Sequence, residues 1–148
     1  MTQSEYTTAE QLPPAWHDLL TAAIEARRNA HAPYSGFAVG AALRTDSGRI
    51  LSGCNVENAS LGLTVCAERV AIWKAISEGE HAFEALVVVS ASGATPCGAC
   101  RQVMSEFVED MPILVADTTG RGWMTSLKAL FPHPFIDLTR RGGISAHE

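Results

Sequence analysis

The sequence lacks any long apolar run and any excess of basic residues. Its longest strongly apolar run, 85–89, is far too short to cross a membrane, and the polar segment 1–18 lacks the basic start and apolar core of a signal peptide. The 16 acidic residues outnumber the 11 basic ones, which gives a net charge of −5. Because nucleic-acid affinity comes largely from Lys and Arg, this balance disfavours a polynucleotide partner. We expect a cytoplasmic protein that binds neither membranes nor nucleic acids.

Cysteine is scarce as well, and the 148 residues contain no visible repeat or low-complexity segment. A chain of this length buries roughly 70% of its unfolded surface, so it can fold as one domain without disulfides. We expect a single domain over 1–148, with an ordered core from about 15 to 138 and polar tails at both ends. The four cysteines therefore need another explanation, and in a reducing compartment a metal site or catalysis is favoured.

The hydrophobic pattern predicts alternating helices and strands. Helical spacing of apolar residues predicts helices near 14–29, 65–77 and 97–108. Strict alternation and apolar runs predict a hairpin over 37–56 and strands at 86–89 and 113–116. The segment 123–130 is ambiguous and fits a short strand followed by a helical turn. This order implies an α/β fold, namely a three-layer α/β/α sandwich around a mixed sheet of about five strands.

Two of the expected helices have features that can be checked. The second carries its apolar side at Val70, Trp73 and Ile76. In the third, Thr95 and Pro96 are typical of an N-cap and a first helical residue. The cysteines lie close to the starts of both helices, where partial positive charge and free N–H groups stabilise a thiolate.

A C-x-x-C motif places Cys97 and Cys100 one helical turn apart, which is the spacing that two ligands of a tetrahedral ion need. Alone, this motif leaves open a metal site, a redox dithiol and a pair of buried small residues. Cys66 lies at another expected helix start, and Glu68 follows two positions later, so three thiols and a carboxylate converge. We expect three protein ligands with an open fourth position, and Cys54 as a buried bystander.

These cysteines belong to a longer series of ordered motifs. The series comprises P-Y-S-G-F-A-V-G-A-A-L at 33–43, N-V-E-N-A-S at 55–60, C-A-E-R at 66–69 and P-C-G-A-C-R-Q at 96–102. Over some two-thirds of the chain, it resembles the zinc-dependent cytidine deaminases in their small homotetrameric form. The resemblance implies one zinc per chain, a homotetramer, and hydrolysis of free cytidine and deoxycytidine to uridine and deoxyuridine with release of ammonia.

The resemblance also implies roles for individual residues. The implied zinc ligands are Cys66, Cys97 and Cys100. Zinc lowers the pKa of its water to about 7, and Glu68 transfers the protons of the reaction. Because three thiolates over-neutralise a dication, Arg69 and Arg101 are expected to donate hydrogen bonds to the sulfur atoms.

The implied substrate contacts are Phe37, Asn55, Glu57, Ala67 and Phe135. Asn55 and Glu57 alternate along an extended segment, so they can form one polar fork for the ribose hydroxyls. Phe37 fits both a contact with the base and the core register of its strand. Phe135 either closes a neighbouring subunit's site or fastens the tail to its own core.

The sequence also allows two functions other than cytidine deamination. A related zinc deaminase of another aminated heterocycle, such as blasticidin S deaminase, would keep Glu68 and change the substrate; Leu61, at a position that is often aromatic in the family, leaves room for this. A zinc-stabilised interaction module would use the thiols only to fold, and it requires a closed fourth ligand and no catalytic carboxylate. A histidine-ligated site is not expected, because the sequence contains no His-x-Glu.

Overall fold

A computed structural model describes residues 7–137 of the chain. Its centre is one mixed sheet in the order β2-β1-β3-β4-β5. The strands are β1 (Val39–Thr45), β2 (Ile50–Cys54), β3 (Phe83–Ser90), β4 (Pro112–Ala116) and β5 (Gly122–Ser126). Strands β3 and β4 are parallel, and the other neighbouring pairs are antiparallel. The expected mixed, five-stranded sheet is confirmed.

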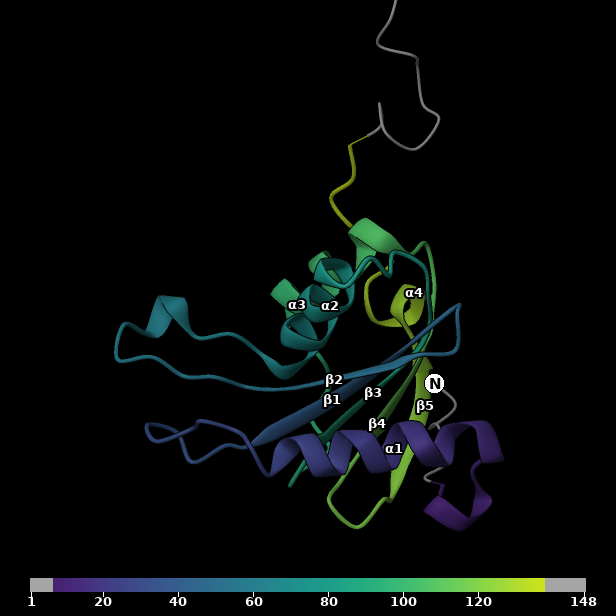
Figure 1. Cartoon of the computed structure of the whole chain (residues 1–148), viewed down its shortest axis with the longest axis horizontal. Coiled ribbons are helices and arrows are strands. Elements are labelled where there is room, and N and C mark those ends of the chain that lie inside the picture. The colour runs from purple at the N-terminus through teal and green to yellow at the C-terminus, as the bar shows by residue number, and fades with distance from the viewer. Residues whose placement is uncertain (1–6, 138–148) are drawn as a thin grey trace, which may run out of the picture.

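Four α-helices cover the two faces of this sheet. They are α1 (Pro14–Arg27), α2 (Ala67–Ser77), α3 (Gly98–Phe107) and α4 (Leu127–Leu130). Helix α1 lies on one face, and α2, α3 and α4 lie on the other (Figure 1). The ambiguous segment after residue 122 thus contains both an edge strand and a helical turn. Within residues 7–137, none of the helices has the length and apolar character needed to cross a membrane.

Strand β3 lies in the middle of the three layers. Leu86 and Val88 contact the core beneath α2 and α3, whereas Val87 and Val89 contact the core beneath α1. This alternation explains why its sequence is apolar at every position from 85 to 89, since both faces of the strand are covered there. The three-layer α/β/α sandwich is therefore confirmed.

Two glycines let helices approach the sheet closely. A Cβ atom at Gly40 would overlap the carbonyl oxygen of Ala23 in α1. At Gly53 it would lie 2.7 Å from both the Ala67 carbonyl oxygen and the Ala71 nitrogen of α2. Real Cβ atoms do not approach so closely, so the backbone of α2 rests directly on β2. This contact fixes the position of the start of α2.

The buried face of α2 differs from the prediction. Val70 and Ile76 are only partly buried, and Trp73 is half exposed. The side chains that are buried are Ala67, Glu68, Ala71, Ile72 and Ala75. Mostly small residues face the sheet because larger ones would hold the helix away from Gly53.

The ordered part of the chain begins before the expected residue 15. Thr7 pairs with Gly122 on edge strand β5, through hydrogen bonds of 2.6 and 3.0 Å between their backbone groups. A 3-10 turn at Ala9–Gln11 follows, and Leu12 is buried in the core beneath α1. The apolar Leu12 therefore anchors a segment whose polar composition indicated a loose tail.

Candidate active site

The starts of α2 and α3 bring three thiols together. Cys66 is the N-cap of α2, Cys97 is the N-cap of α3, and Cys100 lies in the first turn of α3. The Cys97 sulfur lies 3.8 Å from the Cys66 sulfur and 3.6 Å from the Cys100 sulfur. Because Cys97 itself caps α3, the prediction of Thr95 as N-cap is wrong. The chain stays extended through Cys97, which leaves Thr95 in the wall of a cavity.

The spacing of the three sulfur atoms fits zinc. A tetrahedral ion with Zn–S bonds of about 2.3 Å places its sulfur ligands about 3.8 Å apart. All three sulfurs lie within 4.8 Å of one another. Among residues 7–137, no other His, Cys, Asp or Glu belongs to this group of potential metal ligands. Cys54 stands outside it, half-buried at the end of β2. Three thiolates are a donor set suited to zinc, with a fourth coordination position available to water.

Hydrogen bonds give the clustered thiols different pKa values. Bonds from Cys100 and Arg69 lower the pKa of Cys66 to about 5. The hydrogen bond to Cys66, together with burial, raises the pKa of Cys100. Arg69 donates from Nη2 to the Cys66 sulfur at 3.4 Å, and its guanidinium lies 5.9 Å from the centre of the Trp73 ring. Arg69 therefore makes the contact with sulfur that was expected of it.

Arg101 has different partners. Its Nη1 donates to the Leu130 carbonyl oxygen at 2.6 Å, and its Nε donates to the Cys97 carbonyl oxygen at 3.4 Å. Its guanidinium also lies 5.9 Å from the centre of the Phe131 ring. The contacts with Leu130 and Phe131 join α3 to the end of α4, in place of the hydrogen bond to sulfur that we expected.

Glu68 is the buried acidic residue of the site. It lies in the first turn of α2, and only 3% of its surface is exposed. Burial raises the pKa of Glu68 to about 7, because a desolvated carboxylate is disfavoured. A carboxyl group with this pKa can both accept and donate a proton near neutral pH, as general acid–base catalysis requires.

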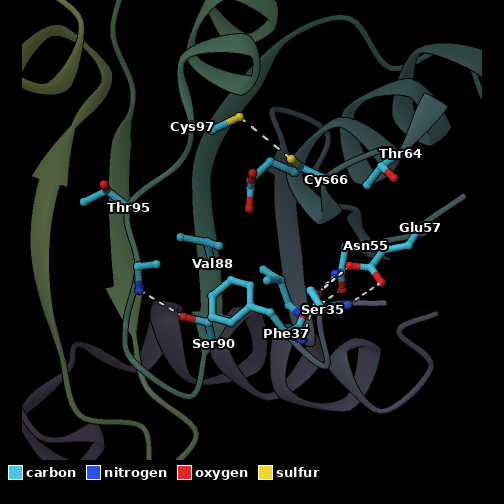
Figure 2. A pocket seen from close by; sticks show the side chains of 13 residues that line it. Ser35, Phe37, Asn55, Glu57, Thr64, Cys66, Val88, Ser90, Thr95 and Cys97 are labelled. Atoms are coloured by element: carbon cyan, nitrogen blue, oxygen red, sulfur yellow. Dashed lines mark hydrogen bonds between the residues drawn. The ribbon is translucent and has the colours of Figure 1, made fainter. Parts of the chain in front are cut away.

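A cavity of about 230 Å³ adjoins the thiols and Glu68. Figure 2 shows Cys66 and Cys97 on one side of it, with Phe37, Ser35, Asn55 and Glu57 on the opposite side. This volume suits a small molecule. Two of the three expected metal ligands, Cys66 and Cys97, therefore surround one space together with Glu68 and the polar fork of Asn55 and Glu57.

Asn55 and Glu57 make hydrogen bonds to the segment before β1. The Asn55 Oδ1 accepts from the Val39 nitrogen at 2.8 Å, and its Nδ2 donates to the Phe37 carbonyl oxygen at 2.7 Å. The Glu57 carboxylate accepts from the Ser35 hydroxyl at 2.5 Å. This bond, with others from neighbouring backbone N–H groups, holds the pKa of Glu57 below its ordinary value.

The two aromatic residues take separate positions. Phe37 precedes β1, is 41% exposed and lines the cavity, so it is not a core residue. Phe135 is 83% exposed, and its backbone is held by the Gln102 side chain through hydrogen bonds of 2.7 and 3.1 Å. The Phe135 backbone is thus fastened to its own α3, whereas its ring lies outside the cavity of the same chain.

Four hydroxyl-bearing residues in the cavity wall were not predicted to belong to the site: Ser35, Thr64, Ser90 and Thr95. Ser35 lies inside the motif at 33–43, so its position two residues before Phe37 was the available signal. Thr64 and Ser90 lie in ordinary surroundings and give no such signal. Only the fold places them at the cavity.

Comparison with known proteins identifies the family. Residues 15–115 match the cytidine and deoxycytidylate deaminase zinc-binding region, so the chain belongs to that family. It is 43% identical to the cytidine deaminase of Sporosarcina psychrophila over 79% of this chain and 88% of the relative. It is 53% identical to the probable cytidine deaminase of Dictyostelium discoideum over 78% of this chain and 80% of the relative.

Solved structures agree with this family. The crystal structure of cytidine deaminase from Burkholderia pseudomallei superposes with a TM-score of 0.77 at 45% identity, covering 80% of this chain and 98% of that one. The blasticidin-S deaminase of Bacillus cereus is more distant, at 35% identity over 64% of this chain and 74% of the relative. The zinc-binding deaminase region and the three-cysteine group together support an enzyme over a zinc-stabilised interaction module.

Proposed function

We propose that this protein hydrolyses free cytidine and deoxycytidine to uridine and deoxyuridine, with release of ammonia. The observation that carries the proposal is the buried Glu68 beside three clustered thiols, at the wall of a cavity sized for a small molecule. Deamination at C4 of cytosine needs a nucleophilic water and a group that moves protons between that water, the ring and the leaving amine. The site offers residues for each task.

Glu68 transfers the protons. In its ionised form it accepts a proton from the attacking water and passes it to N3 of the ring, which makes C4 more electrophilic. After the water oxygen has bonded to C4, Glu68 takes the second proton from that hydroxyl and delivers it to the amino group. The C–N bond then breaks, the C4 carbonyl forms, and ammonia leaves. A pKa of about 7 suits both directions, since neither form of the carboxyl group is strongly favoured at neutral pH.

The thiols and Arg69 prepare the nucleophile. When bound at Cys66, Cys97 and Cys100, zinc supplies the Lewis acidity that makes water a nucleophile at neutral pH. Arg69 offsets the surplus negative charge of the thiolates through its bond to the Cys66 sulfur. The starts of α2 and α3 add their partial positive charge on the same side.

The opposite side of the cavity holds the nucleoside. Phe37 offers its ring to the base, and Asn55 and Glu57 offer amide and carboxylate groups to the ribose hydroxyls. Ala67 lies in the first turn of α2, where backbone N–H groups have no helical partner, and it can donate to the carbonyl oxygen of the base. These contacts favour a small neutral nucleoside, in keeping with the net charge of −5.

The proposal extends to assembly and location. Leu61 and Leu63 are 72% and 66% exposed on a loop that projects from the body, at the left of Figure 1, and Phe135 is exposed elsewhere. Such apolar side chains favour burial against other copies, as in a homotetramer in which Phe135 reaches a neighbouring site. The free thiols favour a reducing compartment such as the cytoplasm.

The test is turnover of purified protein with measured zinc content. We expect about one zinc per chain and formation of uridine and ammonia from cytidine. Glu68→Gln keeps the shape of the side chain, so it should retain zinc and fold while turnover falls by several orders of magnitude. Zinc-loaded protein that converts neither nucleoside, but does convert another compound in a panel of aminopyrimidines, would favour the related deaminase.

A further inference from the structure

The carboxylate of Glu57 is already heavily used within the chain. Its Oε1 accepts hydrogen bonds from the backbone N–H groups of Tyr34 and Ser35, at 2.9 and 3.2 Å. Its Oε2 accepts from the Ser35 hydroxyl at 2.5 Å. A residue that served only to bind a sugar hydroxyl would not need three donors from one loop. Glu57 therefore also organises residues 34–35.

The Ser35 hydroxyl extends this contact to the aromatic residue of the cavity. While it donates to Glu57, its oxygen accepts from the backbone N–H of Phe37 at 3.0 Å. The hydroxyl thus uses its donor on the carboxylate and an acceptor lone pair on Phe37. Donation to an anion also makes a hydroxyl oxygen a better acceptor, so the two bonds reinforce each other.

Phe37 is held from its other side as well. Its carbonyl oxygen accepts from the Asn55 Nδ2 at 2.7 Å, and the nitrogen of Val39, two residues later, donates to the Asn55 Oδ1. The exposed segment before β1 has little core packing of its own, because residues 33–37 are all exposed. These side-chain bonds therefore take the place of core packing in positioning Phe37 (Figure 2).

We propose that Ser35 is a positioning residue, which transmits the hold of Glu57 to Phe37 and so couples the sugar side of the cavity to its aromatic wall. This inference rests on the proposed function for its substrate, but the hydrogen-bonded chain itself is independent of any substrate. Ser35 does not touch the reacting atoms. Its loss should weaken nucleoside binding and leave the proton transfers of Glu68 intact.

The kinetic test compares Ser35→Ala with the unchanged protein. We expect KM for cytidine to rise roughly tenfold, the size of one hydrogen bond to a charged group, with kcat and zinc content little changed. Ser35→Thr keeps a hydroxyl and should recover most of the KM. In the double variant with Glu57→Gln, the two effects on KM should be markedly less than additive, because both changes break the same chain.

A second measurement needs no substrate. Hydrogen exchange of the Phe37 amide should quicken in Ser35→Ala and stay slow in Ser47→Ala, a matched control that removes a serine–carboxylate bond to Glu80 outside the cavity wall. An unchanged Phe37 exchange rate overturns the positioning role even if cytidine is a substrate. Conversely, faster exchange in a protein that does not act on cytidine would support the positioning role of Ser35 and contradict the proposed function. A fall in kcat with unchanged KM would also contradict the proposal.

Discussion

At the scale of single residues, burial and hydrogen bonding give two carboxylates opposite properties. Glu68 is enclosed, and its pKa rises to about 7. Glu57 is only partly buried, and hydrogen bonds from Ser35 and nearby backbone groups lower its pKa. One group is therefore suited to moving protons, whereas the other stays a fixed anion at neutral pH.

The Glu57 contrast predicts a pH effect. Because its pKa is lowered in the folded chain, its contribution to stability is present above its ordinary value of 4.5 and is lost as the pH falls through the lower folded value. An NMR titration of the Glu57 carboxyl carbon should give a midpoint below 4.5. In Ser35→Ala the midpoint should move up towards 4.5, since the hydrogen bond from the Ser35 hydroxyl, the main reason for the lowered pKa, has been removed. Identical midpoints in both proteins would contradict this account.

At the scale of helices and strands, alternation and apolar runs predict the sheet well. The run 85–89 in β3 is apolar at every position because both faces of the strand are covered, and this can be predicted without knowing the fold. The orientation of α2 could not be predicted in the same way. Its burial is decided by close approach to Gly53, a tertiary contact that does not appear as helical spacing of large apolar residues.

The site shows a similar division. The thiols and Glu68 could be found from the sequence, because metal ligands and acid–base groups are few residue types at typical spacings. The partners of Arg101 and the hydrogen bonds of Ser35 could not, since both depend on which loops the fold brings alongside. From the sequence, Phe37 fits both a base contact and the core register of its strand; its 41% exposure, before the start of β1 at Val39, places it outside the core.

The close contact of α2 with β2 gives a prediction at this scale. Gly53→Ala inserts a Cβ 2.7 Å from two backbone atoms of α2, so the helix must shift and its first turn must move with it. We expect the unfolding free energy to fall by about 1–3 kcal/mol, as in overpacked cores, together with a loss of turnover. Thermal melts and cytidine assays measure the two effects.

The matched control for this substitution is Ser52→Ala. It lies on the same strand, and its side chain points to the opposite face from Gly53. It should change stability and turnover little. If Gly53→Ala left the melting temperature unchanged, α2 would not rest on β2 as closely as described.

At the scale of the whole molecule, exposed leucines lead to a prediction about assembly. Sedimentation at working concentration should give about four times the mass of one chain. Replacing Leu61 and Leu63 with serine removes two exposed apolar side chains from the projecting loop, so it should shift the mass towards smaller species. A monomer in the unchanged protein would contradict the proposed homotetramer.

The cysteine caps of α2 and α3 have a further consequence for the molecule as a whole. Neither Cys66 nor Cys97 makes the side-chain hydrogen bond to its own helix that a cap usually supplies. An ion held by both is therefore a cross-link between two helix starts that are 31 residues apart in the chain. Unfolding of the first turn of either helix then disrupts the ion site and destabilises the other helix. The two helices should therefore unfold together while the ion is present, and separately once a chelator has removed it.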